Sequence, residues 1–142
     1  MKKVFVAVMA MVMMLGVLAP VALQTDTASA CALGLSPGYW KNHTEVWDGT
    51  DPEWNGPLPG AYFDEVFGVV GLGPHVTLID ILNTGGGKWN ALNRLAVASL
   101  LNSYGVPDAM AEHYVKAFVL CSYKYYGWQF GVDNLAPYIE SD

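Results

Sequence analysis

The stretch Lys88–Tyr104, KWNALNRLAVASLLNSY, decides the fold. Its apolar residues recur every three or four positions, which is the period of an α-helix with one buried face. Gly105 follows directly and is expected to end the helix. The stretch therefore predicts the best-defined helix of the chain. Its apolar stripe and the residues that widen the stripe are Trp89, Leu92, Ala96, Ser99 and Leu100, then Leu95, Leu101 and Tyr104.

Two shorter helices are expected before this one. Thr77 and Asp80 form a capping box at the start of TLIDILN, and the run Gly85–Gly87 ends that segment. The segment AYFDEVFG, residues 61–68, predicts another short helix. Its inward side chains are expected to be Tyr62, Phe63, Val66 and Phe67.

The first helix of the domain is expected within SPGYWKNHTEVW, residues 36–47. Ser36 is suited to cap this helix, and Pro37 fits its first turn. Trp40, His43 and Trp47 are spaced i, i+3 and i+7, which places them on one face if the helix continues that far.

Beyond the long helix, Asp108 predicts the cap of a helix that runs to about Tyr126. Asp133 predicts a short turn near the C-terminus. The buried stripe of the 108–126 helix is expected to be Met110, Tyr114, Ala117, Phe118, Cys121 and Tyr125.

No segment shows the alternation of a half-buried strand, and the loops at 48–60 and 69–75 are rich in glycine and proline. These patterns predict an all-α fold, a small single-domain bundle of four to six short helices with long Gly/Pro loops.

The first thirty residues have the pattern of a signal peptide. Lys2 and Lys3 precede a long apolar run, and Ala28-Ser29-Ala30 offers the small residues that signal peptidase requires. We expect residues 1–30 to be removed and residues 31–142 to form one secreted domain. Two alternatives remain open: an uncleaved membrane anchor, and a lipoprotein with its lipid on Cys31.

The charge of the chain excludes some partners. The formal net charge is −6, and it becomes −7 when Lys2, Lys3 and Asp26 leave with the leader. The remaining basic residues are scattered, so no patch suits nucleic acid or an anionic membrane. We expect no nucleic-acid partner and no membrane association after cleavage.

Two cysteines remain in the mature chain. Oxidising compartments favour a Cys31–Cys121 disulfide, which would tie the mature N-terminus to the 108–126 helix. The alternative is a pair of free thiols.

The common catalytic motifs are missing. Gly85–Lys88 resembles part of a phosphate-binding loop, but Trp89 stands where that motif needs Ser or Thr. His43, His75 and His113 come from separate segments and would need Glu45, Asp48 or Glu112 beside them to hold zinc, so we expect no metal and no cofactor.

A glycosidase would need two carboxylates facing one cleft. The acids of residues 48–65 lie close together in sequence, with Trp47 and Trp54 available to stack on sugars. We interpret this segment as a solvated loop, and we keep a small secreted hydrolase as the second hypothesis. The acids are Asp48, Asp51, Glu53, Asp64 and Glu65.

The segments SPGYWKNHTEVW and TLIDILNTGGGKWNALNRLAVASLLN resemble a group of small secreted prokaryotic domains with the signature GYWKNH-x-x-x-W. The resemblance covers residues 36–102, and Thr44 stands where that group has Pro. It implies an extracellular module, and it transfers no catalytic residue.

The sequence therefore predicts a non-enzymatic extracellular or cell-envelope module that acts by binding or assembly. Its partner is expected to be an extracellular protein or a glycan. The candidate ligand-binding residues are Trp40, His43, Trp47 and Trp54.

Overall fold

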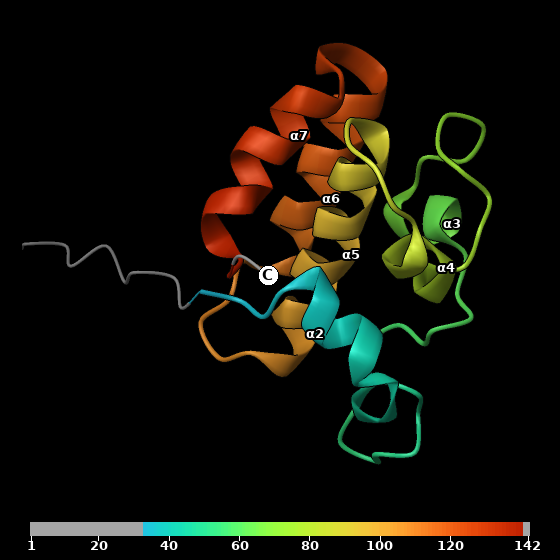
Figure 1. Ribbon diagram of the computed structural model, residues 1–142, viewed down its shortest axis with the longest axis vertical. Helices are drawn as coiled ribbons and strands as arrows, with labels where there is room; N and C mark the ends of the chain where they lie inside the picture. The colour runs from blue at the N-terminus through green and yellow to red at the C-terminus, as the bar shows by residue number, and fades with distance from the viewer. Residues whose placement is uncertain (1–32, 141–142) are drawn as a thin grey trace, which may run out of the picture. The chain divides into compact units, whose positions relative to one another are not determined.

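A computed structural model describes residues 33–140, within the compact unit Cys31–Asp142. The predicted leader, residues 1–30, lies outside the described residues. The predicted all-α class is confirmed: the described part contains six α-helices and no strand (Figure 1). In chain order they are α2 (Pro37–Asn42), α3 (Phe63–Phe67), α4 (Leu78–Asn83), α5 (Trp89–Gly105), α6 (Glu112–Cys121) and α7 (Trp128–Leu135). Three single turns accompany them: η1 (Thr44–Val46), η2 (Ser122–Tyr126) and η3 (Ala136–Tyr138).

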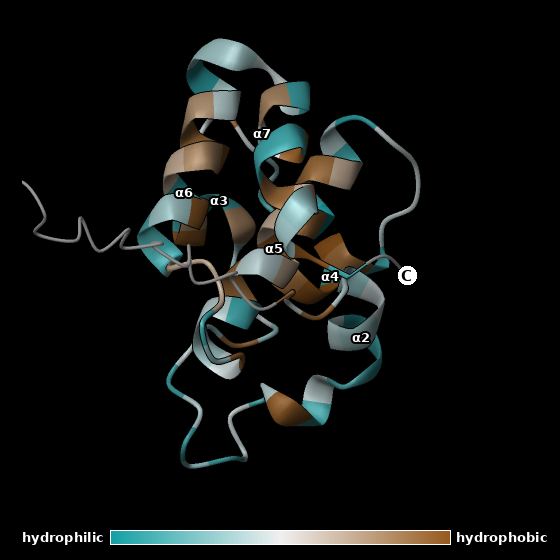
Figure 2. Cartoon of the chain, turned by 90° about the vertical axis from the view of Figure 1, so that its left-hand side faces the viewer, coloured by the Kyte–Doolittle hydropathy of each residue, from teal (hydrophilic) through white to brown (hydrophobic). Residues whose placement is uncertain are grey.

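Helix α5 is the centre of the bundle. Residues 96–102 are buried without a break, and two full turns of helix leave no side facing solvent there. Helices α2, α4, α6 and α7 all contact it. Figure 1 shows α6 running antiparallel to α5, and α7 turning back beside both. Apolar segments of α4 and α5 meet in the interior, as Figure 2 shows.

The short helices before α5 match their predicted positions. The hydroxyl of Ser36 accepts the amide of Tyr39 at 3.1 Å, so the predicted cap of α2 is confirmed. The amide of Asp80 donates to Thr77 at the start of α4, and the Thr77 hydroxyl donates to the Asp80 carboxylate at 2.6 Å. In α3 the prediction is partly wrong, because Tyr62 is exposed.

Helix α2 ends earlier than the aromatic spacing suggested. It stops at Asn42, and the single turn η1 follows. Trp40 and Trp47 are both buried, but His43 between them is exposed. The three side chains therefore do not share one helical face.

The predicted start and buried face of the 108–126 helix are wrong. Asp108 has a φ of 60°, which is a left-handed conformation, and α6 is capped by Ala111 instead. The buried face of α6 is also displaced by one residue from the predicted stripe. Val115 and Val119 are buried, whereas Tyr114 is exposed. These two valines have the same i, i+4 spacing as the predicted stripe, so periodicity alone could not choose between the faces.

Helix α7 was not expected. Asp133 lies inside it rather than at its start. The helix packs closely on α5 because Gly131 has no side chain: a Cβ there would overlap Leu92 and lie 2.6 Å from the Ser122 hydroxyl.

The expected Cys31–Cys121 disulfide is not supported. Cys121 is a free cysteine at the end of α6, and Cys31 lies outside the described residues. The chain enters the described part at the other end of the bundle, where Gly34 packs against Asn102 near the end of α5. Gly34 is held there by backbone hydrogen bonds with Tyr138 and Glu140, each 2.8 Å long.

Candidate functional site

Two of the four predicted ligand-binding residues belong to the core. Trp40 is 1% exposed, and its indole nitrogen donates to Oδ1 of Asn102 at 2.9 Å. Trp47 is fully buried and donates to the carbonyl oxygen of Trp40 at 3.1 Å. Neither ring offers a face to a ligand in this conformation, which favours a structural interpretation of the GYWKNH signature.

The other two candidates are not among the residues that line the three pockets described below. The ring of His43 packs on Tyr39 with 4.4 Å between ring centroids, and its Nδ1 lies 3.0 Å from the Glu45 carboxylate. Trp54 is half-buried against Tyr104 and donates to the carbonyl oxygen of Pro57 at 3.2 Å. The ring of Trp54 also lies 6.1 Å from that of Trp40, so the structure brings Trp40, Trp47 and Trp54 together, with the first two buried.

The acids of residues 48–65 serve different local roles. Asp48 and Asp51 each accept the backbone amide two residues ahead, from Thr50 and Glu53, which organises the loop. The hydrogen bonds from Thr50 lower the pKa of Asp48. None of the three pockets described here is lined by two carboxylates.

Asp64 instead lies beneath His75. Its carboxylate is almost fully buried, and both oxygens lie near Nδ1 of His75, at 2.9 and 3.1 Å. The exposed imidazole stacks on Tyr62 with a centroid separation of 4.1 Å. The pair connects the loop before α4 to α3. Among residues 33–140, no group of three or more His, Cys, Asp or Glu side chains is placed to hold a metal ion.

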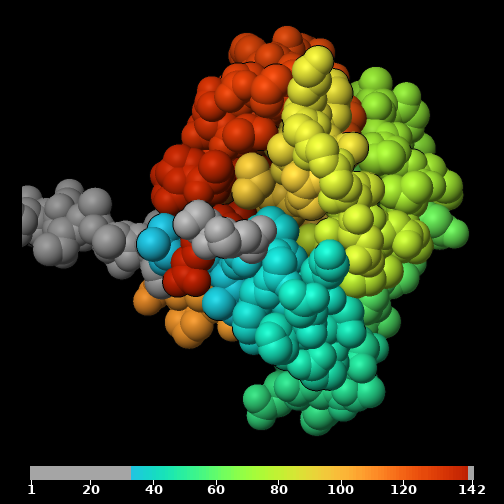
Figure 3. Space-filling model, viewed as in Figure 1, coloured from blue at the N-terminus to red at the C-terminus, as the bar shows by residue number. Residues whose placement is uncertain are grey.

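The strongest candidate site is a groove of about 560 Å³, which we call the Trp89 groove. One wall comes from the loop before α4, another from α4, and a third from the start of α5 and from η2. In Figure 3 the yellow segment at the start of α5 lies between the red C-terminal segment and the green segment. The lining residues are Leu72, Pro74, Val76, Ile81, Thr84, Trp89, Asn90, Asn93 and Tyr123.

An aromatic pair lies in this groove. Trp89 and Tyr123 have ring centroids 4.5 Å apart with 31° between the ring planes. Trp89 remains 37% exposed. Tyr123 comes from η2, a π-helical turn, and such turns are frequent at functional sites. Burial raises the pKa of Tyr123, and its hydroxyl donates to Asn93 at 2.8 Å.

The edge of the groove is held in a strained conformation. Lys88 has a φ of 58°, which is rare for a residue with a side chain, and it directly precedes Trp89. Arg94 donates to the carbonyl oxygens of Thr84 and Gly86, both at 2.8 Å, and so fixes the glycine turn. Trp89 is therefore positioned before any ligand arrives.

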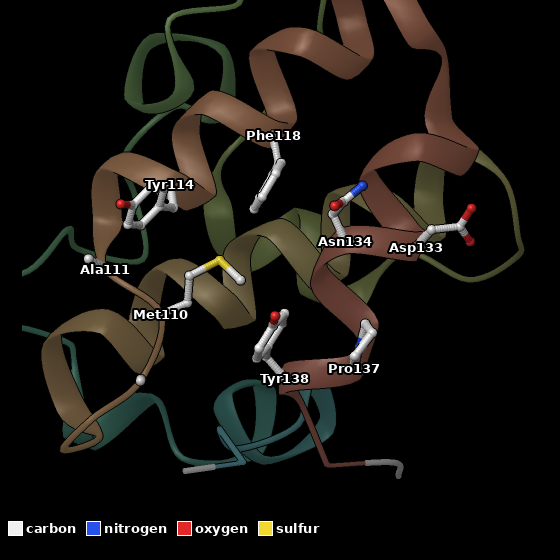
Figure 4. A pocket seen from close by; sticks show the side chains of 9 residues that line it. Met110, Ala111, Tyr114, Phe118, Asp133, Asn134, Pro137 and Tyr138 are labelled. Atoms are coloured by element: carbon white, nitrogen blue, oxygen red, sulfur yellow. The ribbon is translucent and has the colours of Figure 1, made fainter. Parts of the chain in front are cut away.

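A second pocket of about 390 Å³ lies between α6, α7 and η3. Figure 4 shows Met110, Phe118 and Tyr138 projecting toward the same space, with Asp133 pointing away from it. The pocket is mostly apolar, and it holds no pair of groups suited to acid–base chemistry.

A third pocket, of about 290 Å³, contains an ionic network. The Tyr104 hydroxyl donates to Glu112 at 2.6 Å, and Lys116 lies 2.5 Å from the same carboxylate. Burial, together with the hydrogen bond to Glu112, raises the pKa of Tyr104 to about 12. The hydrogen bonds from Lys116 and Tyr104 lower the pKa of Glu112.

None of the four ligand-binding residues predicted from the sequence lines the Trp89 groove. The periodicity of residues 88–104 places Trp89 on the buried stripe of α5, and no local pattern marks Asn93 as a ligand-binding candidate. One signal was available: Lys88 alone separates Trp89 from the three glycines, so Trp89 lies in the first turn of its helix, where fewer neighbours cover a side chain.

No helix among the described residues is both long and apolar enough to cross a membrane. Comparisons with protein-family models, with curated proteins and with solved structures give no match for this chain.

Proposed function

We propose that this protein is an exported, non-enzymatic binding module that holds an extracellular partner in the Trp89 groove. One observation carries the proposal: the largest of the three pockets contains an accessible aromatic pair, Trp89 and Tyr123, and is lined by no carboxylate, imidazole, thiol or amine. Aromatic side chains in a preformed groove supply binding energy, whereas catalysis needs a nucleophile or an acid–base group.

Export rests on the leader pattern of residues 1–30 and on the resemblance to secreted domains. The acidic mature chain agrees with a partner that is neither nucleic acid nor an anionic membrane. The second hypothesis, a hydrolase using the acids of residues 48–65, has less support. Asp64 is engaged by His75, and the carboxylates of Asp48 and Asp51 accept loop amides.

The test begins with the mature end of the protein. Intact-mass measurement of the exported protein should give a chain that starts at Cys31, with no added lipid mass. A chain that keeps residues 1–30 and remains in the cytosol would contradict the assignment to the cell exterior.

Binding is tested with peptide and glycan arrays. The comparison includes the wild type, Trp89→Ala and Tyr125→Ala, because Tyr125 is an exposed ring that does not line the groove. A ligand retained by wild type and Tyr125→Ala but lost by Trp89→Ala supports the proposal. Turnover of an array compound contradicts the proposal, and so does binding that Trp89→Ala leaves unchanged.

A further inference from the structure

We infer that the Trp89 groove takes an uncharged, apolar polypeptide segment whose main-chain carbonyl accepts a hydrogen bond from Asn93. This inference rests on the proposed function and names the partner class for the same site. Three features of the groove point to a peptide: its aliphatic walls, its lack of charge, and one side-chain amide donor, Nδ2 of Asn93, that has no partner among the described residues.

The walls are suited to side chains rather than to sugars. Leu72, Pro74, Val76 and Ile81 line the groove together with the aromatic pair. Leu72 and Val76 are also exposed to solvent, at 52% and 36%. A sugar ring needs hydrogen-bonding groups around its edge, whereas aliphatic walls gain free energy only by covering apolar surface. A leucine or phenylalanine side chain meets this requirement.

The electrostatics favour a segment without charge. Among the described residues, no lining side chain is ionised at neutral pH. The nearby guanidinium of Arg94 is already hydrogen-bonded to Thr84 and Gly86. A charged ligand side chain would lose its hydration in this groove and find no opposite charge among the lining residues.

Asn93 supplies the polar contact that orients the segment. The residue is 3% exposed, and its Oδ1 accepts the Tyr123 hydroxyl. Within residues 33–140, its Nδ2 has no hydrogen-bond partner, and the residue lines the groove. A ligand that covers this amide must offer an acceptor, because a buried donor without a partner is costly. A peptide carbonyl beside an apolar side chain is such an acceptor.

The start of α5 adds a second preference for an acceptor. Lys88 provides no side-chain cap, and the first turn contains no acidic residue. The first amides of a helix lack intrahelical partners and carry partial positive charge. They therefore favour a second carbonyl of the same segment near Trp89.

The test uses random heptapeptides displayed on phage, panned against the full chain. A neutral oligosaccharide series, from chitobiose to chitohexaose and from cellobiose to cellohexaose, is tested in parallel by calorimetry. Enriched peptides are then synthesised and titrated against Trp89→Ala, Asn93→Asp and Tyr125→Ala. Asn93→Asp keeps an acceptor for the Tyr123 hydroxyl and replaces the Nδ2 donor with a second acceptor oxygen, which also brings a negative charge to this place. Circular dichroism checks that each variant is folded, and Trp89→Ala provides the test if Asn93→Asp does not fold.

Uncharged apolar peptides should be enriched. Their affinity should fall by about tenfold or more in Trp89→Ala and Asn93→Asp, and should stay within about twofold in Tyr125→Ala. Trp89-dependent binding of an oligosaccharide, with no apolar peptide enriched, overturns the peptide assignment and leaves the proposed function standing. Enrichment of charged peptides also overturns the assignment. Absence of any Trp89-dependent ligand overturns both proposals.

Discussion

The indole nitrogen of Trp40 donates to the side-chain oxygen of Asn102, 62 residues away, at 2.9 Å. The same oxygen accepts the backbone amide of Leu35, and Nδ2 of Asn102 donates to the carbonyl oxygen of Leu35, both at 3.0 Å. One asparagine of α5 therefore joins the GYWKNH segment and the residue before its cap to the centre of the bundle. The relation gives the signature tryptophan a physical role that needs no ligand.

The first prediction follows from these three hydrogen bonds. Asn102→Ala leaves the Trp40 nitrogen and both backbone groups of Leu35 without their partner in a mostly buried place. We expect unfolding free energy to fall by about 2–4 kcal/mol, measured by urea denaturation. Asn83→Ala is the matched control, since that amide caps a carbonyl on an exposed surface, and it should cost less than about 1 kcal/mol. Equal effects of the two substitutions would contradict the role of Asn102.

The elements with strong local signals could be predicted from sequence. The period of α5, the Ser36 cap and the Thr77 cap each rest on residues that are neighbours in the chain. Helix α7 could not be found in this way, because it depends on Gly131 fitting against Leu92, 39 positions away. The prediction of the buried face of α6 was wrong for a related reason. Two stripes of this segment are equally periodic, and only packing on the bundle selects Val115 and Val119.

The candidate site was harder to predict than the fold. Tryptophan serves both cores and ligands, so composition could not separate Trp40 and Trp47 from Trp89. What separates them is burial, which depends on contacts such as that between Trp40 and Asn102. The contact between Trp89 and Tyr123 also joins residues 34 positions apart. Tyr123 lies in a π-helical turn, which no local sequence pattern predicts.

The second prediction concerns the contact between α7 and α5. Gly131→Ala places a methyl group against Leu92 and the Ser122 hydroxyl, so side chains must shift. We expect a loss of about 1–3 kcal/mol in unfolding free energy. Gly85→Ala is the control, because a Cβ there meets nothing within 4 Å, and it should change stability by less than about 0.5 kcal/mol. If Gly131→Ala left the unfolding free energy unchanged, α7 and α5 would be packed less tightly in solution than in this structure.

The third prediction concerns Asp64 and His75. His75→Ala leaves a buried carboxylate without its imidazole donor, and we expect a loss of about 1–3 kcal/mol in unfolding free energy. A double-mutant cycle with Asp64→Ala should show coupling, the pair costing less than the sum of the single losses. The exposed pair His43–Glu45 has the same chemistry and a similar distance, and its coupling should stay below about 1 kcal/mol. Equal coupling in both pairs would show that burial of Asp64 adds nothing.

The fourth prediction concerns stability in alkali. The phenol of Tyr104 ionises near its ordinary pKa of 10.0 when the chain is unfolded, and its pKa is raised to about 12 in the fold by burial and by Glu112. Between these values the folded chain holds a proton that the unfolded chain has lost. The stabilisation is therefore complete below pH 10 and is lost as pH rises toward 12.

Tyr104→Phe removes this proton while it keeps the ring that packs on Trp54. The wild type should lose stability more steeply than Tyr104→Phe between pH 10 and 12, in urea titrations at fixed ionic strength. Tyr125→Phe, which alters a largely exposed ring, should follow the wild type, because no hydrogen bond holds its hydroxyl among the described residues. Parallel curves for the wild type and Tyr104→Phe would show that the Glu112 hydrogen bond does not hold the phenol proton in solution.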